Sequence, residues 1–308
     1  MMSDILTGPH GHDYAKLATL LRSFGDEKVV FVANPGNAGD ALINLGMYAF
    51  FDHIGLQWES GQLGATYPDR IVIYSGGGAL LDIYPNGDAF FLRNHPVCKA
   101  LVLLPHTVRG YAGMLADMDE RCHLFAREAE TLTYLREHAQ RAHVHYGHDM
   151  AFFLSDQTIA EMNWDRQFLL RPEIRVSWPK MMLKILATLK LRDPVLHILR
   201  GDAEATGASI PAYNYDLSEL FSSGHLLNDP GGYMTPGICA STIKALRLLL
   251  RSARQVETNR LHMTVLSAIV GTPVTMMDNS YGKNRGIYER SIRDYFPAVT
   301  FEPAPLRA

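Results

Sequence analysis

The sequence predicts an α/β protein built from two domains, each with a parallel sheet. Short apolar runs typical of buried strands alternate with helical segments over residues 28–146, and a second set of this kind begins at residue 195. Glycines or polar residues follow almost every predicted strand, and ligands of open α/β sheets bind at these strand ends. We therefore expect domains over residues 1–160 and 194–308 that face a central cleft, joined by a linker and an amphipathic helix over residues 161–193.

The composition is that of a globular protein from a reducing compartment. The chain has 308 residues, of which 47% are hydrophobic and 20% charged, and its net charge of −3 gives no basic field for nucleic acid. The three cysteines are widely spaced and form no C-x-x-C pair. The N-terminus lacks the pattern of a signal peptide, and no uncharged run reaches the roughly 18 residues of a membrane span. We expect a cytoplasmic protein, which can still work at the inner face of the membrane.

Local sequence patterns predict the order of strands and helices in the first domain. Runs of β-branched and apolar residues mark strands, and apolar residues at helical spacing mark helices. The predicted strands are Lys28–Ala33, Arg70–Tyr74, Lys99–Leu104, Arg121–Ala126 and His143–Tyr146, and the predicted helices are Tyr14–Phe24, Ala41–Ile54 and Glu130–His138. Five strands alternating with helices indicate a doubly wound parallel sheet. His10, His12 and Asp13, in a Gly/Pro-rich start, are interpreted as part of a mobile tail.

A glycine-rich turn, Asn34–Asp40 (NPGNAGD), separates the first of these strands from its helix. Glycines let a ligand approach the backbone, and a helix N-terminus offers N–H groups to an anion. The turn is neither a Walker loop nor a G-x-G-x-x-G motif. Asp40 suits the N-cap of the helix, and a ligand contact by Asn37 and Asp40 is an equally good interpretation.

Other strand ends of this domain carry further candidates. Gly77 and Gly78 belong to a run of three glycines, whose entropic cost favours close approach of a ligand over simple packing. Asp82 either caps the next segment or holds a substrate hydroxyl. His106 follows the third strand and is either a site residue or a half-exposed loop histidine.

Two more strand ends, at Arg127 and Asp149, complete the row of candidate ligand loops in this domain. Four histidines gather near the fifth strand, at positions 138, 143, 145 and 148. Alternation along the strand separates His143 and His145 from neighbours on the other face, and no paired carboxylates accompany them. We expect no metal site.

The second domain is predicted from a similar alternation. Its strands are Val195–Leu199, Ala253–Glu257, Val274–Met277 and Phe296–Phe301, its long helix is Thr235–Leu250, and Gly224–Tyr233 is a loop. Arg200 directly follows the first of these strands. Before this domain, the helix expected over Lys180–Leu191 is rich in Met, Leu and Lys, a composition that also suits a membrane surface.

The segment Glu257–Lys283 carries a signal for an anion site. Arg260 and His262 open a helical run, and Asn279 and Lys283 follow the next strand. Cationic side chains beside a helix N-terminus suit a phosphate ester or a carboxylate. An Arg-x-His pair is weak evidence by itself, so an interpretation as exposed helix residues and a solvated lysine stays open.

Taken in order, these segments resemble the polysaccharide pyruvyl transferase family, from about Val29 to Tyr288. The matching stretches are Asn34–Asp40, Ser75–Leu80 (SGGGAL), Leu104–His106, Phe125–Glu128 (FARE), His148–Ala151 (HDMA), Leu199–Glu204 (LRGDAE), Thr258–His262 (TNRLH), Gly271–Pro273 and Asp278–Lys283. Arg260 and His262 match the family's Arg-x-His, and Arg200 matches an arginine at a strand end. The chain departs at His106, where the family often has Gln.

The resemblance implies two Rossmann-like domains similar to those of GT-B glycosyltransferases. It also implies transfer of a pyruvyl group from phosphoenolpyruvate to a sugar of an exopolysaccharide or its lipid-linked repeat unit, forming a ketal. The C-terminal domain would hold the donor and the N-terminal domain the acceptor. The residues expected are Arg200, Arg260, Asn279 and Lys283 for the donor, Asn37, Gly77, Gly78 and His106 for the acceptor, His262 as general acid, and Asp40 or Asp82 on the hydroxyls.

We expect no cofactor beyond phosphoenolpyruvate as co-substrate, and no metal, because arginine and lysine can stabilise the leaving phosphate. Peripheral membrane association and a homo-oligomer are compatible with this interpretation. A nucleotide-sugar glycosyltransferase of the same fold and a non-catalytic component of a polysaccharide assembly complex are the alternatives. Release of phosphate from phosphoenolpyruvate in the presence of an acceptor glycan would distinguish a pyruvyl transferase from the glycosyltransferase. A non-catalytic component would lose nothing when Arg260 and His262 are replaced.

Overall fold

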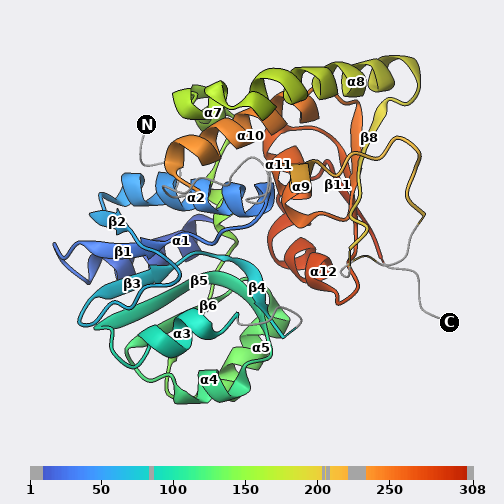
Figure 1. The fold of residues 1–308 in the computed structure, drawn as a ribbon. Coiled ribbons are helices and arrows are strands. Elements are labelled where there is room, and N and C mark those ends of the chain that lie inside the picture. The colour runs from blue at the N-terminus through green and yellow to red at the C-terminus, as the bar shows by residue number, and fades with distance from the viewer. Residues whose placement is uncertain (1–9, 83–86, 203–204, 206–208, 221–233, 304–308) are drawn as a thin grey trace. The chain divides into compact units, whose positions relative to one another are not determined.

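The computed structural model describes residues 10–82, 87–202, 205, 209–220 and 234–303 (Figure 1). The chain divides into two compact units, Met1–Asn34 with Gly46–Phe153 and Pro35–Leu45 with Leu154–Ala308. The predicted loop Gly224–Tyr233 and Glu204 of the Leu199–Glu204 stretch lie outside the described residues.

The first unit is a parallel sheet with helices on both faces (Figure 1). Its strands are β1 (Val29–Val32), β2 (Trp58–Ser60), β3 (Ile71–Tyr74), β4 (Gly77–Leu81), β5 (Ala100–Arg109), β6 (Cys122–Ala126) and β7 (His143–Tyr146). Its helices are α1 (Gly11–Arg22), α3 (Ala89–Asn94), α4 (Ala112–Asp117), α5 (Ala129–His138) and the 3-10 turn η1 (Met150–Phe153). Helix α2 (Ala38–Ile54) begins in residues grouped with the second unit and ends in the first. The five strands predicted here are present, and β2 and β4 add to them.

The strand order β2-β1-β3-β5-β6-β7 confirms a doubly wound parallel sheet. The chain runs from β1 to one side for β2 and then to the other side for β3, so the direction of winding reverses between β1 and β3. In open α/β sheets, ligands bind outside the carboxyl ends of the strands at such a reversal. At this point the hydroxyl of Tyr74 donates to Oδ1 of Asn34 over 3.2 Å, which ties the two strand ends together.

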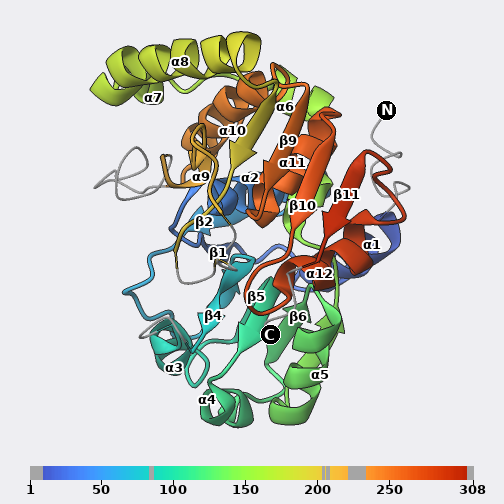
Figure 2. The ribbon, with the colours of Figure 1, turned by 90° about the vertical axis from the view of Figure 1, so that its right-hand side faces the viewer.

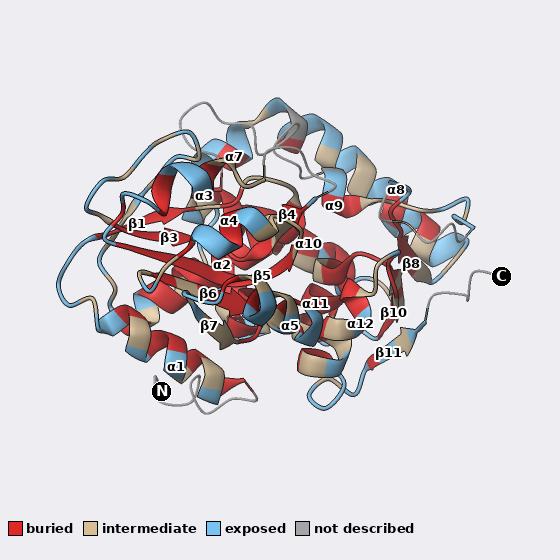
Figure 3. Ribbon diagram, turned by 90° about the horizontal axis from the view of Figure 1, so that it is seen from below, coloured by how far each residue is buried: buried red, intermediate tan, exposed pale blue. Residues whose placement is uncertain are grey.

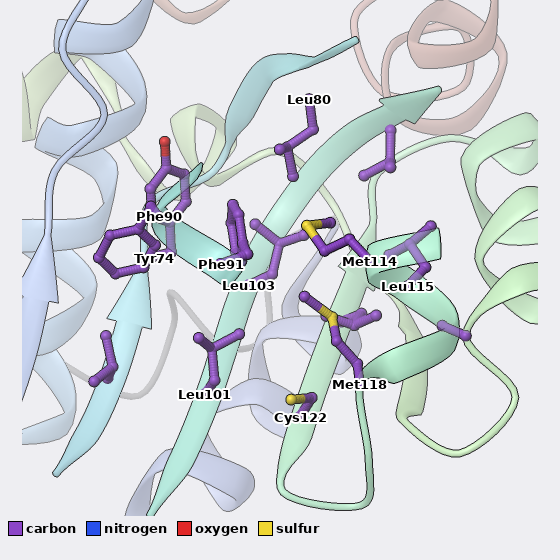
Figure 4. Packing of buried hydrophobic residues seen from close by; sticks show 14 of the residues in the cluster. Tyr74, Leu80, Phe90, Phe91, Leu101, Leu103, Met114, Leu115, Met118 and Cys122 are labelled. Carbon is purple, nitrogen blue, oxygen red and sulfur yellow. The ribbon is translucent and has the colours of Figure 1, made fainter. Parts of the chain in front are cut away.

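The central strands are apolar on both faces because helices cover both. Val30 and Val32 point into a core that α3, α4 and α5 close, and Figure 4 shows part of this cluster. Phe31 lies on the other face, with its ring centroid 5.1 Å from that of Phe51 in α2. Burial of both faces explains why these strands are continuous apolar runs and not alternating ones.

Strand β5 is longer than the sequence predicted. The prediction ended it at Leu104, directly before Pro105, a residue that has no N–H to donate. The strand instead continues to Arg109, and the register towards β6 shifts between Leu103 and His106, which accommodates the proline at an irregularity. His106 therefore lies within a strand, fully buried, and the prediction that it ends one is wrong.

His143 and His145 lie as the alternation along the strand predicts. They share a face of β7 and stack with His123 of β6, at centroid distances of 4.8 and 5.5 Å. His10 does not belong to a mobile tail. It is buried at the start of α1, and its ring lies 4.2 Å from that of His148.

The second unit contains a parallel sheet of order β11-β10-β9-β8, and Figure 2 shows β9, β10 and β11 side by side. The strands are β8 (Val195–Ile198), β9 (Gln255–Thr258), β10 (Val274–Met277) and β11 (Val299–Glu302). The helices are α6 (Asp156–Glu161), α7 (Arg166–Leu170), η2 (Glu173–Ser177), α8 (Trp178–Leu191), α9 (Leu217–Leu220), α10 (Pro236–Leu250), α11 (Leu261–Val270), α12 (Lys283–Ile287) and η3 (Tyr288–Ile292).

Local signals set the ends of the long helices in this unit. Thr235 caps α10 by accepting from the N–H of Ile238, and Pro236 occupies the first position, where no N–H is needed. Gly271 ends α11 with a φ of 77°, a left-handed conformation that favours glycine. Both ends agree with the sequence prediction.

The segment expected as a linker and amphipathic helix contains α7, η2 and α8 and is grouped with the second unit. Asp156, just before it in α6, accepts from Nε of Arg247 over 2.6 Å and from Nη1 of Arg251 over 2.7 Å. These contacts join α6 to α10. Among the described residues, no helix has the length and apolar character needed to cross a bilayer.

Candidate active site

The glycine-rich turn after β1 closes on itself through a capping box. Oδ1 of Asn37 accepts from the N–H of Gly39 over 2.8 Å, and Oδ2 of Asp40 accepts from the N–H of Asn37 over 3.0 Å. This reciprocal pattern satisfies two N–H groups at the start of α2. Asn37 is therefore the N-cap, and the prediction that Asp40 caps the helix is wrong by three residues.

Arg260 lies between β9 and α11, with only 5% of its surface exposed. Its Nε and Nη2 donate to Oδ1 and Oδ2 of Asp216, over 3.1 and 2.5 Å. Its Nη2 is also 3.2 Å from Oε1 of Glu219. A planar guanidinium held by two parallel bonds has a fixed orientation, which a flexible lysine would not have.

Arg200 joins Arg260 because β8 and β9 are adjacent parallel strands whose ends are in register at Ile198 and Thr258. Arg200 donates from Nε and Nη2 to Asp202, over 2.7 and 2.8 Å, and Nη2 of Arg260 is 3.6 Å from the same carboxylate. Two buried guanidinium groups thus share one carboxylate at the carboxyl edge of the sheet. Parallel pairing brings together residues that are far apart in the sequence.

The turn before α2 reaches the same cluster. Nδ2 of Asn37 donates to Oε1 of Glu219 over 3.0 Å, and the hydroxyl of Ser218 donates to Oδ1 of Asn37 over 3.2 Å. Glu219 is therefore a bridge from Asn37 to Arg260. Its side chain is 50% exposed, whereas that of Arg260 is 6% exposed, so the carboxylate is the accessible member of the pair.

His262 lies against the first turn of α2. A Cβ built on Gly39 would be 2.7 Å from Nδ1 of His262, closer than real Cβ contacts allow, and 3.0 Å from Oδ1 of Asn37, which is also tight. Position 39 therefore has to be glycine for the imidazole to lie where it does. This places the predicted general acid beside a helix N-terminus and two residues from Arg260.

Three asparagines connect the ends of β9 and β10. Nδ2 of Asn284 donates to the backbone oxygens of Asn259 and Met277, over 2.9 and 2.8 Å, and its N–H donates to Oδ1 of Asn279 over 3.4 Å. Within the described residues, the buried Nδ2 of Asn279 has no hydrogen-bond acceptor. Lys283 is also buried, with Nζ 5.2 Å from the centre of the Tyr281 ring.

The sequence comparison decides the family. The signature of the polysaccharide pyruvyl transferase family matches residues 37–281, which extends from the N-cap of α2 to the loop after β10. The chain belongs to this family. It is a pyruvyl transferase, an enzyme that transfers a pyruvyl group to polysaccharide.

Individual relatives of this pyruvyl transferase agree with the assignment. The protein named putative pyruvyl transferase EpsO, from Bacillus subtilis (strain 168), is 25% identical over 284 residues, which are 82% of this chain and 81% of that protein. The crystal structure of a functionally uncharacterized protein from Klebsiella pneumoniae subsp. pneumoniae superposes with a TM-score of 0.74 at 23% identity, covering 94% of this chain and 98% of the other. The second comparison supports the fold.

The structure brings together part of the predicted site of this pyruvyl transferase. In the second unit, Arg200 and Arg260 share a carboxylate, Asn37 reaches Arg260 through Glu219, and His262 lies against the turn that Asn37 caps. Asn279 and Lys283 follow the adjacent strand β10. Asp40 belongs to the same turn as Asn37, since its Oδ2 accepts from the N–H of Asn37 over 3.0 Å.

The remaining predicted residues belong to the first unit. Gly77 and Gly78 open β4, which pairs with β5, and Gly77 lies opposite His106. Nε2 of His106 accepts from the N–H of Ala79 over 3.1 Å. Asp82 is exposed directly after β4. Strands β3 and β4 thus both pair with β5. The predicted role of Gly77 and Gly78 with the acceptor stays a prediction.

Arg127 and Asp149, suggested by the sequence as ligand-loop residues, pair with each other instead. Nη1 of Arg127 donates to Oδ2 of Asp149 over 2.5 Å, and the two side chains are 1% and 0% exposed. Nε of Arg127 donates to the hydroxyl of Thr107, and Glu128, fully buried, is 3.0 Å from Nη1 of Arg109. The FARE and HDMA stretches therefore supply buried ion pairs that hold together the ends of β5, β6 and β7. We call the pairs Arg127–Asp149 and Arg109–Glu128 the ionic brace.

Sequence reasoning missed Asp216 and Glu219. Asp216 lies 44 residues before Arg260, and no repeat or spacing relates the two. The available signal was the chemistry of Arg260, because a buried guanidinium requires a carboxylate partner. That requirement predicts an acid near Arg260 and does not say which one.

Proposed function

We propose that this pyruvyl transferase uses phosphoenolpyruvate as donor and forms a ketal with two hydroxyls of one sugar, on an exopolysaccharide or its lipid-linked repeat unit. The pair of buried arginines at the ends of β8 and β9, with His262 beside them, carries this proposal. Phosphoenolpyruvate has a carboxylate and a phosphate, and two guanidinium groups match the two anions. Pyruvyl transfer as the family reaction favours this donor over a nucleotide sugar.

The carboxylates around the arginines suggest how the donor binds. Asp216 contacts Arg260 at two points and fixes its orientation, whereas Glu219 makes a single contact from a half-exposed side chain. An oxygen of the donor is chemically equivalent to the oxygen of Glu219, so the donor can replace Glu219 on Arg260. Asn279, whose buried Nδ2 has no acceptor within the described residues, and Lys283 supply further donors from the end of β10.

The reaction requires a proton at the methylene carbon of the donor. Protonation there makes C2 cationic, and one sugar hydroxyl attacks C2 and loses its proton. The second hydroxyl then displaces phosphate from C2 and gives its proton to the leaving group, so the products are the ketal and inorganic phosphate. His262 is the proposed acid, because imidazole exchanges protons near neutral pH. Asp82 and Asp40 remain the proposed partners of the hydroxyls, and Asp40 would act from within the capping box of α2.

Titration with phosphoenolpyruvate tests the donor site. Arg260→Ala and Arg200→Ala should each weaken binding by about 2–5 kcal/mol, because each removes a charge-assisted contact from a buried site. Arg251→Ala is the matched control, since this exposed arginine of the same unit pairs with Asp156 outside the cluster. Phosphate release with an acceptor glycan then confirms turnover. The donor assignment is wrong if the wild type does not bind phosphoenolpyruvate, or if both variants bind it as the wild type does.

A further inference from the structure

Helices α7 and α8, with η2 between them, carry apolar side chains that face solvent. Leu170, Val176, Leu183 and Leu191 are 57%, 54%, 69% and 74% exposed. Figure 3 shows exposed and intermediate residues along both helices. Isolated exposed aliphatic residues are ordinary, but several of them within one short segment indicate an interaction surface.

The opposite side of this segment is anchored on the second unit. Ile185 and Thr188 are buried, and the hydroxyl of Thr188 is 3.0 Å from that of Tyr215. Nζ of Lys184 lies 5.7 Å from the centre of the same tyrosine ring. Anchoring of one face fixes which residues point outwards, and Leu183 and Leu191, eight residues apart, lie on the outward face together.

The charge of the segment is opposite to that of the rest of the chain. Residues 166–192 contain seven arginines and lysines and one glutamate, a charge of +6. Because the whole chain carries −3, the rest of it carries −9. In a two-fold symmetric dimer the same surface of each copy meets itself, so this positively charged segment would repel its copy. An anionic surface would attract it.

From these observations we propose that α7, η2 and α8 form a docking surface for a membrane that contains anionic lipids. The exposed leucines enter the boundary between headgroups and acyl chains, and the lysines beside them remain at the phosphates. A convex helix face with aliphatic side chains fits a lipid surface, which needs no complementary pocket, better than it fits a folded protein. The segment lies in the interface plane and does not cross the bilayer. This proposal does not depend on the donor or on the acceptor sugar.

Flotation of the full chain with vesicles tests the docking surface. The probes are vesicles of phosphatidylcholine alone and of phosphatidylcholine mixed with phosphatidylglycerol, at low and at high salt. Binding to the anionic vesicles that weakens with salt is expected, because counterions screen the lysines and arginines. A shift of tryptophan fluorescence to shorter wavelength, lost in Trp178→Phe, would place the first turn of α8 at the lipid.

Two variants separate the apolar and the charged contributions. Leu183→Gln/Leu191→Gln should lower vesicle affinity by at least about tenfold, since each leucine loses its transfer into lipid. Lys180→Gln/Lys190→Gln should lower affinity for anionic vesicles by about tenfold or more. The matched control is Leu92→Gln/Leu248→Gln, which replaces leucines that are 47% and 46% exposed on other helices and should bind as the wild type does. All of these side chains are exposed, so melting temperatures should change little.

Three results would overturn the proposal. One is equal binding to neutral and anionic vesicles, or none to either. Another is a Leu183→Gln/Leu191→Gln variant that binds like the wild type. The last is a smaller sedimentation coefficient of that variant without lipid, which would show that the surface holds a second copy of the chain.

Discussion

Gly39→Ala should lower the turnover number of this pyruvyl transferase and leave its affinity for the donor unchanged. Gly39 is the second residue of α2, where alanine is normally the better helix former by about 1 kcal/mol. In this protein the added methyl group would lie 2.7 Å from Nδ1 and 3.2 Å from Cγ of His262. The substitution thus adds a single methyl group beside the proposed acid and does not replace His262 itself.

The distances set the size of the effect. To restore an ordinary contact of 3.4 Å, the ring has to move by about 0.7 Å from its 2.7 Å approach. Misplacement of a catalytic group by about 1 Å can cost on the order of 10²-fold in rate, so a fall in kcat of about 10- to 100-fold is expected. Overpacking costs about 1–3 kcal/mol and the helix propensity of alanine offsets about 1, so the free energy of unfolding should fall by about 0–2 kcal/mol.

The assay compares kcat, donor affinity and stability for each variant. Phosphate release from phosphoenolpyruvate with an acceptor glycan gives kcat, titration gives donor affinity, and urea denaturation gives stability. Gly113→Ala is the control, because Gly113 also lies inside a helix, α4, and no atom would come within 4 Å of its added Cβ. That variant should be as active as the wild type and slightly more stable.

His262→Gln, measured beside these variants, tells which part of the reasoning fails. It should lower turnover by roughly 10²–10⁴-fold and keep most donor affinity. A folded Gly39→Ala enzyme with wild-type turnover would refute the packing argument if His262→Gln is inactive. If both variants turn over normally, His262 is not the acid, and His106 is the next candidate.

Two predictions concern the first unit. Arg127→Met leaves Asp149 buried without its cation, so the free energy of unfolding, measured in urea, should fall by about 3–5 kcal/mol, and an unchanged value would contradict the ionic brace. Burial, and then the neighbouring rings of His145 and His143, lower the pKa of His123 from 6.5 to about 4. Between these values the unfolded chain takes up a proton that the native protein excludes, so stability should decrease as the pH falls from 6.5 to about 4 and level off below. Because the ring is only partly buried, solvent screening reduces the effect to about 1 kcal/mol. His123→Gln should flatten this part of the pH profile, and a profile unchanged by the substitution would contradict the assignment.

Continuous apolar runs allowed the strands to be predicted, because a strand covered on both faces has no polar alternation. The same rule placed Arg200 and Arg260 correctly at the ends of β8 and β9. It failed at β5, where Pro105 lies at a shift of register, and no local signal announces such a shift. The predicted N-cap of α2, Asp40, was also wrong. Asn and Asp are equally good N-caps, and the capping box of this helix contains both Asn37 and Asp40.

The sequence by itself determined the α/β class, the family, and the position of Arg200 and Arg260 at the ends of strands. These follow from local patterns, because consecutive residues determine a strand, a glycine-rich turn or the start of a helix. Only the tertiary structure decided which groups meet. It paired Arg260 with Asp216, paired Arg127 with Asp149, and brought Gly39 against His262. A buried charge requires a partner, but the partner is chosen by the packing of distant segments, which one-dimensional spacing does not contain.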